Sequence, residues 1–585
     1  MRGHARLVVA TLAAVGLLFL EPPATSAADP EIDALLRSPV AKDWITNGGN
    51  LTNQRYSTLK QIDRTNVKQL KGAWMTRLKG SGLGGKYSFE ATPLVKDGIM
   101  YVVTGNDDVF ALNAKTGEFL WEYWSGIDQR ISTICCGWVN RGLAMGEGLI
   151  FLGQLDSNVV ALDIKTGKVA WKTPIEKWEN GYGITSAPLY YDGIIYSGIT
   201  GGEFGVRGRL TALDAKTGKI LWVWYTLPGP GEIGADTWPP GTDHHTRGGA
   251  TIWNTPALDP ELGLIYFAVG NCGPDYDGSM REGDNLFCTS IVALKAKTGE
   301  YAWHFQTTPG ETWDFTATQP IILADLIIDG QERKVLMHAP KNGYFYVLDR
   351  ITGKFISGKP FVKRMTWSMG LDKNGRPIEA PGARYTTDSI RIWPGAGGAH
   401  NWAPMSYSPI TGLVYFAGNE NSATYVPMPP SEFRFTPGRG NTGLGRGQGP
   451  IPDTEYAATQ PEVTGRFLVA WDPVKQQERW RVLFGTAGGG AGPTLATAGG
   501  LVFSGNAAYN AETGERVWEE PLLGERPIGW ITYMLDGKQY VSVTARSNPN
   551  HRLFTFTLDG GATMPPLPPA APAQGRGGRG AAPTQ

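Results

Sequence analysis

The chain is 585 residues long and carries no net formal charge, because 54 Lys and Arg residues balance 54 Asp and Glu residues. A nucleic-acid-binding protein needs a basic surface, so this balance argues against that class of protein. The balance also gives no reason to expect electrostatic attachment to a membrane surface. The 78 glycines and 20 tryptophans, with short apolar runs between them, are typical of many short strands joined by tight turns.

The first 27 residues have the layout of a secretory signal peptide. Arg2 and Arg6 precede an apolar run over residues 7–20, and small residues follow as far as Ala27 and Ala28. A run of about 14 residues is too short to span a bilayer comfortably, and this order of regions is typical of an export signal. We expect cleavage after Ala27 or Ala28, export to the oxidising periplasm, and no transmembrane segment in the mature chain.

Two adjacent cysteines, Cys135 and Cys136, are unusual. Neighbouring Cα atoms are about 3.8 Å apart, whereas disulfides usually join Cα atoms about 4.4–6.8 Å apart. A bond between them closes a strained ring that ties no distant segments together, so its plausible use is a stiff, flat surface for a ligand. The alternative is two unrelated thiols, which an oxidising compartment disfavours. Cys272 and Cys288 could form a second bridge, but four cysteines allow three pairings.

A short phrase recurs along the chain and is clearest in Ala111-Leu-Asn-Ala-Lys-Thr-Gly117, which Trp121 follows. The Asn or Asp side chain can accept hydrogen bonds from the turning backbone, and glycine tolerates a positive φ. The tryptophan then packs on the sheet from the returning strand. Further copies, some weaker, end at Gly167, Gly218, Gly299, Gly353, Gly412, Gln477 and Gly514. Repeats of roughly 40–50 residues with β patterning indicate a β-propeller, and eight copies predict eight blades.

The last interval of the repeat, from Gln477 to Gly514, is 37 residues long and is too short for a full four-stranded blade. We therefore expect the last blade to be shortened, incomplete or closed differently. Residues 228–249 and 425–465 are rich in Gly and Pro and are predicted to be loops on one face. The chain then divides into a signal peptide (1–27), a propeller domain (28–559) and a disordered Pro/Ala/Gly-rich tail (560–585).

Four polar residues, Glu90, Glu203, Asn271 and Asp314, stand in glycine-rich or strand-end contexts. Carboxylate and amide oxygens suit a hard cation such as calcium. Each of these residues, taken alone, is better explained as a turn or capping residue. The sequence contains no Cys-x-x-Cys-His motif, so we expect no c-type haem on this chain.

Together with the cysteine pair, these residues resemble the periplasmic quinoprotein alcohol dehydrogenases. Members of that family use pyrroloquinoline quinone (PQQ) and a metal ion in an all-β, eight-bladed propeller. The resemblance runs from about Asp43 to Ala545 and begins with Asp43-Trp44 and Asn53-Gln-Arg-Tyr-Ser57. The combination of motifs is far more specific than any one of them.

The resemblance implies a role for each matching position. A Cys135–Cys136 disulfide ring would lie against one face of the quinone, and Trp253 would stack on the other. Asp314 would be the catalytic base and would bind the metal ion together with Glu203 and Asn271. The residues implied to hold the cofactor's edge or to face its carbonyl groups are Glu90, Arg141, Thr185, Thr200, Gly201, Gly202, Lys341 and Asn401.

Two positions refine this expectation. Lanthanide-dependent relatives place a further Asp two residues after the base, where this chain has Thr316. One fewer negative ligand favours a divalent ion, so we expect calcium. Relatives often have Trp or Asn near the quinone where this chain has Ala491, so that contact is lost or replaced.

The predicted activity is the oxidation of an alcohol to the carbonyl compound by hydride transfer to PQQ, with polyols, sugars and aldehydes open as substrates. The electrons would pass to a separate periplasmic cytochrome c or a similar acceptor. The alternative is a non-catalytic β-propeller that scaffolds envelope assembly. Such a scaffold shares the hairpin repeat but has no reason to combine paired cysteines with Glu203, Asn271 and Asp314.

Overall fold

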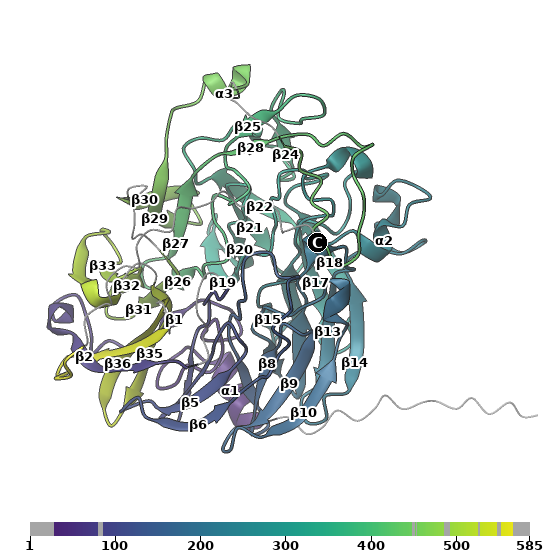
Figure 1. Ribbon diagram of the computed structural model, residues 1–585. Coiled ribbons are helices and arrows are strands. Elements are labelled where there is room, and N and C mark those ends of the chain that lie inside the picture. Colours follow the sequence, from purple (N-terminus) through teal and green to yellow (C-terminus); the bar gives the residue numbers. More distant parts are fainter. Residues whose placement is uncertain are drawn as a thin grey trace, which may run out of the picture.

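The computed structural model describes residues 29–79, 86–446, 451, 453–484, 492–523, 527–546 and 551–564. The predicted signal peptide, Ala491 and residues 565–585 of the predicted tail lie outside these ranges. Within them, eight sheets of four or five strands surround a common centre (Figure 1). The predicted all-β, eight-bladed propeller is confirmed.

Five blades each use four strands that follow one another directly and pair antiparallel. They are β3 (Leu94–Lys96), β4 (Ile99–Val103), β5 (Val109–Asn113) and β6 (Phe119–Tyr123); β7 (Ala144–Gly146), β8 (Leu149–Gly153), β9 (Asn158–Asp163) and β10 (Val169–Pro174); β11 (Leu189–Tyr191), β12 (Ile194–Gly198), β13 (Arg209–Asp214) and β14 (Ile220–Tyr225); β15 (Ala257–Asp259), β16 (Leu264–Ala268), β17 (Ser290–Lys295) and β18 (Tyr301–Gln306); and β19 (Ile321–Ile328), β20 (Gln331–His338), β21 (Tyr344–Asp349) and β22 (Phe355–Pro360).

The other three blades are less regular. The sixth contains β26 (Ser406–Ser408), β27 (Leu413–Glu420), β29 (Gly465–Asp472) and β30 (Gln477–Phe484). The seventh contains β31 (Leu495–Thr497), β32 (Leu501–Ser504), β33 (Ala507–Asn510) and β34 (Arg516–Glu519), with β1 (Tyr56–Ser57) paired parallel to β31. The eighth joins β35 (Pro527–Leu535), β36 (Lys538–Ala545) and β37 (Arg552–Thr557) to β2 (Lys71–Arg77).

Smaller elements decorate the loops. Two two-stranded sheets pair β23 (Ser368–Leu371) with β24 (Pro377–Glu379) and β25 (Ile390–Ile392) with β28 (Ala423–Tyr425). The α-helices are α1 (Pro30–Arg37), α2 (His244–Arg247) and α3 (Glu455–Ala458). Single 3-10 turns occur at Val67–Gln69, Trp178–Asn180, Gly202–Phe204, Ala235–Thr237, Gly278–Arg281 and Pro521–Leu523. No helix in the described ranges is both long and apolar enough to cross a membrane.

The recurring phrase forms the predicted turn between the third and fourth strands of a blade. In the first copy, Asn113 Oδ1 accepts hydrogen bonds from the N–H groups of Lys115 (2.9 Å) and Thr116 (3.2 Å). Gly117 closes the turn with φ of 75°, a left-handed conformation that glycine adopts without strain. The turn chemistry read from the sequence is therefore the chemistry in the structure.

The tryptophan of the repeat packs on the neighbouring blade rather than only on its own sheet. Trp121 of β6 lies over Gly167 of the next blade and donates its indole N–H to Ile164 O at 3.1 Å. A Cβ on Gly167 would lie 2.5 Å from the Trp121 ring, so the position requires glycine for packing as well as for its φ. The same packing of ring on glycine joins Trp171 to Gly218, Trp222 to Gly299, Trp303 to Gly353 and Trp480 to Gly514.

The eight copies of the repeat predict one copy in each blade, but the structure does not distribute them in that way. Gly412 lies between β26 and β27, and Gln477 starts β30, so both copies belong to the sixth blade. The eighth blade carries no copy. The count of eight blades is correct because one doubled copy compensates for one missing copy.

The short 37-residue interval is accommodated by shortening strands. The seventh blade keeps four antiparallel strands, but each has only three or four residues. Gly505 and Asn506 alone connect β32 to β33. No strand is missing from this blade. The shortening therefore lies one blade earlier than expected, because the last blade, the eighth, has strands of six to nine residues.

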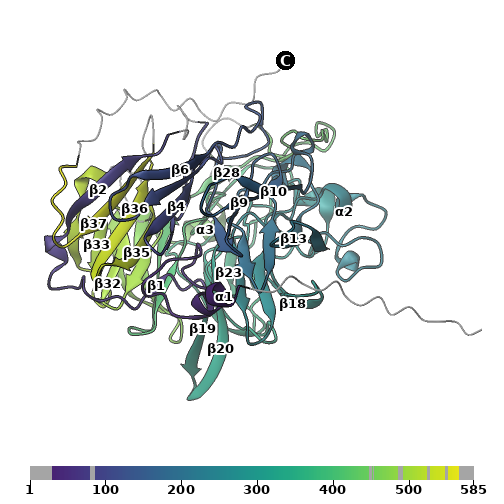
Figure 2. The same ribbon diagram turned by 90° about the horizontal axis from the view of Figure 1, so that it is seen from below.

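Both ends of the chain close the ring. Strand β2 from the N-terminal part pairs antiparallel with β37, so the purple and yellow strands lie together in Figures 1 and 2. Trp74 of β2 then packs on Gly117 of the first blade and donates its indole N–H to Ala114 O at 3.1 Å. The eighth blade thereby docks onto the first by the same contact that joins other neighbouring blades.

An N-terminal segment fills the centre of the ring. Four of its carbonyl groups accept backbone hydrogen bonds of 2.8–3.0 Å from the first strands of four successive blades. The acceptor and donor pairs are Leu51 with Leu258, Thr52 with Leu323, Gln54 with Tyr407, and Arg55 with Ala496. The segment 51–55 therefore ties the fourth to seventh blades together.

Candidate active site

The predicted site residues lie on loops at one end of the propeller. Adjacent strands in a blade are antiparallel, so the start of the first strand and the end of the second lie at the same end. Residues that precede a first strand are Glu90, Cys135, Cys136, Arg141, Thr185, Trp253, Asp314 and Asn401. Residues that follow a second strand are Thr200, Gly201, Gly202, Glu203, Asn271 and Lys341. The topology therefore gathers positions that are up to 311 residues apart in the sequence.

Arg141 contacts three other predicted cofactor residues. Its guanidinium donates to Thr185 Oγ1 and to Trp253 O, both at 2.8 Å, and lies 2.7 Å from the Glu90 carboxylate. It also lies over the Trp253 ring, 4.8 Å from the ring centre. Burial raises the pKa of Glu90, and the charge of Arg141 opposes that rise. These contacts hold four loops in a fixed arrangement.

Gly201 and Gly202 bring Glu203 beside Asn271. Gly201 has φ of 107°, and a Cβ there would collide with Gly181 O. A Cβ on Gly202 would lie 3.4 Å from the side-chain amide of Asn271. Thr200 anchors the start of this loop, because its N–H donates to Gly183 O at 2.8 Å. The residue before Glu203 therefore packs against the side chain of Asn271.

The amide of Asn271 is held by a residue that the sequence did not single out. Its Nδ2 donates to Asp275 Oδ1 at 2.7 Å, and both residues are 2% exposed. No described residue donates a hydrogen bond to Asn271 Oδ1, so this oxygen is available to a cation. Asp275 lies four residues after Asn271 in the same loop, a spacing that could have suggested the contact.

Asp314 forms an ion pair with Lys341. Lysine Nζ lies 3.0 Å from Asp314 Oδ2, and the Tyr276 hydroxyl donates to the same oxygen at 3.4 Å. Burial raises the pKa of Asp314, and the charge and hydrogen bond of Lys341 oppose that rise. Burial also lowers the pKa of Lys341, but Asp314 outweighs this effect and the net pKa is raised. The two predicted residues are thus in direct contact.

The cysteine pair expose surface toward this group of residues. The Cys135 thiol lies close enough to Glu203 and Asp314 to interact with their charges. The Cys136 thiol interacts in the same way with Glu90 and Lys341. The two Sγ atoms lie 2.6 Å apart, longer than the about 2.05 Å of a disulfide bond. The structure therefore leaves them unbonded, and the predicted bond stays a prediction.

The other two cysteines are bonded. Cys272 and Cys288 form a disulfide with an S–S distance of 2.10 Å. The bridge starts at the residue after Asn271 and closes a loop between β16 and β17. It therefore restrains the segment that carries Asn271, Asp275 and Tyr276.

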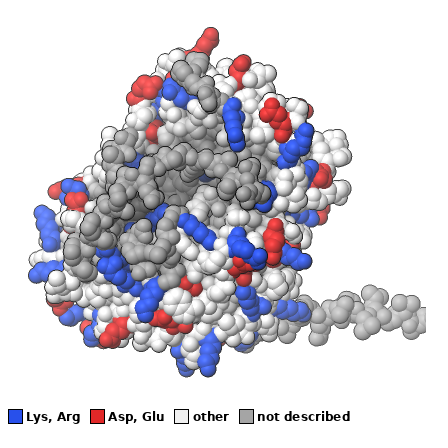
Figure 3. All heavy atoms as spheres, viewed as in Figure 1, with Lys and Arg blue, Asp and Glu red and all other residues white. Residues whose placement is uncertain are grey.

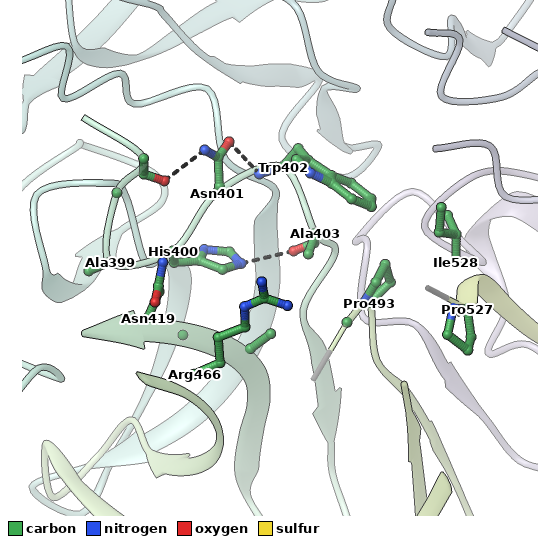
Figure 4. A pocket seen from close by; sticks show the side chains of 15 residues that line it. Ala399, His400, Asn401, Trp402, Ala403, Asn419, Arg466, Pro493, Pro527 and Ile528 are labelled. Atoms are coloured by element: carbon green, nitrogen blue, oxygen red, sulfur yellow. Dashed lines mark hydrogen bonds between the residues drawn. The ribbon is translucent and has the colours of Figure 1, made fainter. Parts of the chain in front are cut away.

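A cavity of about 250 Å³ adjoins the site on the side of Asn401 (Figure 4). Asn401 is held within its own loop, because Nδ2 donates to Gly397 O and Oδ1 accepts from Trp402 N. The Asn401 loop is also joined to Lys341, the ion-pair partner of Asp314, because Ala399 N donates to Lys341 O at 2.9 Å. The Arg466 side chain points into the cavity in Figure 4, and no described residue pairs with it.

The donor set suits a cation. Burial and the negative charge of Asp314 raise the pKa of Glu203, so two partly buried carboxylates that repel each other lie close together. A hard cation would relieve that repulsion. No group of three His, Cys, Asp or Glu side chains in the described ranges is placed to hold a metal ion. Thr316, which stands where lanthanide-dependent relatives have a further Asp, accepts a hydrogen bond at its hydroxyl from Gln319 Nε2 at 3.2 Å.

Two more buried residues near Asp314 were missed in the sequence. Glu311 and Arg281 are each 1% exposed and contact the backbone of the Asp314 and Asn271 loops. Glu311 precedes Asp314 by three residues, but many turns contain such a carboxylate. Arg281 is 33 residues away from Asp314, so no local signal could have connected the two.

Comparison with known proteins agrees with this geometry. The family model described as PQQ glucose, ethanol and alcohol dehydrogenase β-propeller domain matches residues 44–363. That match covers more than half of the chain. The chain therefore belongs to the family of PQQ-dependent alcohol dehydrogenases, and the protein is an enzyme of that class rather than a non-catalytic scaffold.

Individual relatives are similar over most of the chain. Quinohemoprotein alcohol dehydrogenase ADH-IIG of Pseudomonas putida is 43% identical, and the match covers 93% of this chain and 78% of the relative. The solved structure of ADHIIG from Pseudomonas putida HK5 has a TM-score of 0.84 at 40% identity, covering 94% of this chain and 85% of the other.

The names of two further relatives mention an electron acceptor or a metal. A 1-butanol dehydrogenase (cytochrome c) of Thauera butanivorans is 37% identical, covering 89% of this chain and 79% of the relative. A solved europium-containing methanol dehydrogenase has a TM-score of 0.80 at 29% identity, covering 90% of this chain and all of the other.

Proposed function

We propose that this enzyme oxidises an alcohol to the carbonyl compound in the periplasm, with PQQ and Ca²⁺ as cofactors and Asp314 as the catalytic base. The observation that carries the proposal is the contact of Asp314 with Lys341 beside the Glu203 and Asn271 loops. The proposed base, the proposed cation ligands and the residues that would cover the two faces of the quinone then lie at the same end of the propeller.

The chain's own residues would divide the work of the reaction. PQQ, when bound, supplies a two-electron acceptor for the hydride that leaves the alcohol carbon. Asp314 would take the hydroxyl proton at one carboxylate oxygen while Lys341 holds the other. Since a base must be ionised, the charge of Lys341 offsets the effect of burial on Asp314.

Other residues would hold and orient the cofactor. The Cys135–Cys136 pair and the Trp253 ring would cover opposite faces of the planar quinone, whose faces are apolar. Glu90, Arg141 and Thr185 would hold its edge as one hydrogen-bonded unit. Thr200, Gly201, Gly202 and Asn401 would complete that edge.

Glu203, Asn271 and Asp314 would hold the metal ion. Two carboxylates and one neutral amide suit a divalent ion better than a trivalent one, and the Thr316 hydroxyl is already engaged by Gln319. We therefore favour calcium, although one structural relative is named for europium. Restoration of activity to metal-free enzyme by lanthanum but not by calcium would contradict this choice.

A separate cytochrome c is the proposed electron acceptor. One relative is named a cytochrome c-linked 1-butanol dehydrogenase, and this chain has no Cys-x-x-Cys-His motif. The signal-peptide pattern of residues 1–27 supports a periplasmic location. On the face drawn in Figure 3, acidic and basic side chains are interspersed, so that face offers no dominant charge for docking.

The experiment that tests the proposed function is reconstitution. Purified protein would receive PQQ and Ca²⁺, and the absorbance of bound PQQ would be followed before turnover is measured with an artificial electron acceptor. A panel of primary alcohols, polyols, sugars and aldehydes would identify the substrate. Absence of cofactor binding, or binding without turnover of any substrate in the panel, would contradict the proposal.

A further inference from the structure

Glu311 holds the backbone on both sides of Asp314. Its Oε2 accepts hydrogen bonds from the N–H of Trp313 at 3.2 Å and from the N–H of Phe315 at 2.9 Å. Asp314 itself has φ of 60°, a left-handed conformation that is unusual for a residue other than glycine. One carboxylate oxygen therefore holds the N–H groups of the residues before and after Asp314, and the Phe315 N–H belongs to one of the two peptide units that flank it.

Arg281 connects Glu311 to the Asn271 loop. Its Nε and Nη2 donate to Pro274 O at 3.3 and 3.0 Å, and its Nη1 donates to Asn285 Oδ1 at 3.0 Å. Its Nη2 also lies 3.8 Å from Glu311 Oε1, and both side chains are fully buried. Pro274 is only three residues after Asn271. The guanidinium therefore bridges the loop of the base and the loop of a predicted metal ligand.

We propose that Arg281 and Glu311 form a buried brace that sets the position of Asp314 relative to Asn271, and that Glu311 is a positioning residue for the reaction. This inference rests on the proposed role of Asp314 as base. Glu311 acts through the backbone, since its carboxylate oxygens face two N–H groups and Arg281. Placement matters because an error of about 1 Å at a reacting group can lower the rate about 100-fold.

Stability alone is a weak reason for such a brace. Burying two charges is unfavourable, and apolar replacements of buried ion pairs are often neutral or stabilising. The carboxylate does satisfy two buried N–H groups, which is a structural role that any turn could need. A matched control must therefore separate the effect on folding from the effect on the reaction.

Asp259 offers that control, because it has the same kinds of partner away from the site. Its Oδ1 accepts from the N–H groups of Glu261 (2.9 Å) and Leu262 (3.1 Å), and its Oδ2 accepts from Arg350 Nε at 2.7 Å. Asp259 is 3% exposed and Arg350 is 6% exposed. Asp259 is the last residue of β15, at the opposite end of that blade from the site loops.

The test compares Glu311→Ala with Asp259→Ala in the PQQ- and Ca²⁺-loaded enzyme. We expect both to lower thermal stability by similar amounts and to bind PQQ with unchanged absorbance. Only Glu311→Ala should lower kcat, by about 10- to 100-fold, with KM changed less than about twofold. Hydrogen exchange at the amides of Trp313 and Phe315 should accelerate in Glu311→Ala and stay unchanged in Asp259→Ala.

Equal losses of kcat in the two variants, or unchanged amide exchange at residues 313 and 315, would overturn the brace. If Glu311→Ala does not fold, Glu311→Gln keeps one acceptor oxygen but loses the charge that faces Arg281, and its kcat should still fall several-fold; an unchanged kcat overturns the inference. Wild-type enzyme that binds no PQQ would instead refute the proposed function, and amide exchange would then decide the brace by itself.

Discussion

Asp314 combines the two demands of a buried base. It must be ionised to accept a proton, yet burial raises its pKa. The structure meets this conflict with Lys341 at 3.0 Å, and the proposed cation would add a second positive charge. Lys341 and the proposed cation ligands Glu203 and Asn271 lie on three other loops, so the suitability of Asp314 as a base depends on four loops.

Replacing Asp314 by Asn tests its role directly. The amide is nearly isosteric but cannot accept the proton, so kcat should fall about 10²- to 10⁴-fold, the usual contribution of a general base. PQQ absorbance should be retained, since none of the proposed edge contacts involves this side chain. Turnover close to that of the wild type, with cofactor bound, would count against Asp314 as the base.

His338 predicts how stability responds to acid. Burial lowers the pKa of its imidazole from 6.5 to about 3. The unfolded chain binds a proton near pH 6.5 and the folded protein does not, so this group costs stability as pH falls from about 6.5 toward 3. The slope is about 1.4 kcal/mol per pH unit.

Denaturant unfolding at pH 7 and pH 5 would measure this contribution. Other groups also titrate, so the comparison is between wild type and His338→Gln. The loss of unfolding free energy between the two pH values should be about 2 kcal/mol smaller in the variant. An equal loss in both proteins would show that His338 does not control this acid response.

At the scale of the element, one hairpin turn is used both within a blade and between blades. The Asx residue and the glycine shape the turn, and the tryptophan of the preceding blade covers that glycine. The contact is therefore a packing unit between neighbouring sheets. This packing also explains why the left-handed position is occupied by glycine and not by Asn, which can adopt a positive φ but carries a Cβ.

Gly167→Ala and Gly412→Ala separate the two reasons for glycine. Their φ values are 69° and 68°, but a Cβ on Gly167 would lie 2.5 Å from Trp121 whereas a Cβ on Gly412 would meet nothing within 4 Å. Both should lose about 1 kcal/mol from backbone strain, and Gly167→Ala should lose a further 1–3 kcal/mol from overpacking. Thermal or denaturant unfolding measures the difference, and equal losses would contradict the packing role.

At the scale of the whole molecule, closure depends on residues near both ends of the chain. The eighth blade takes β2 from residues 71–77 and β37 from residues 552–557, and Trp74 fastens that blade to the first. The segment 51–55 ties four other blades together at the centre. Removing either β2 or β37 leaves open strand edges and an uncovered apolar face.

Truncation tests this closure. A chain ending at Ala545 lacks β37 and should fail to unfold cooperatively, because β36 and β2 lose their shared neighbour. A chain ending at Met564 keeps β37 and the hydrogen bond from Ala562 N to Gly72 O, so its Tm should match that of the full chain. A cooperative transition in the shorter chain would show that seven blades and a remnant suffice.

The sequence by itself determined the hairpin chemistry, the propeller class and the residues of the candidate site, because turns and short motifs are local and their residue types report their chemistry. Its repeat nevertheless assigned two copies to different blades when Gly412 and Gln477 share one. Only the tertiary structure decided that Trp121 packs on the next blade, that segment 51–55 fills the centre, and that Asp275, Arg281 and Glu311 support Asn271 and Asp314. Those contacts join residues through space, and no spacing along the chain encodes them.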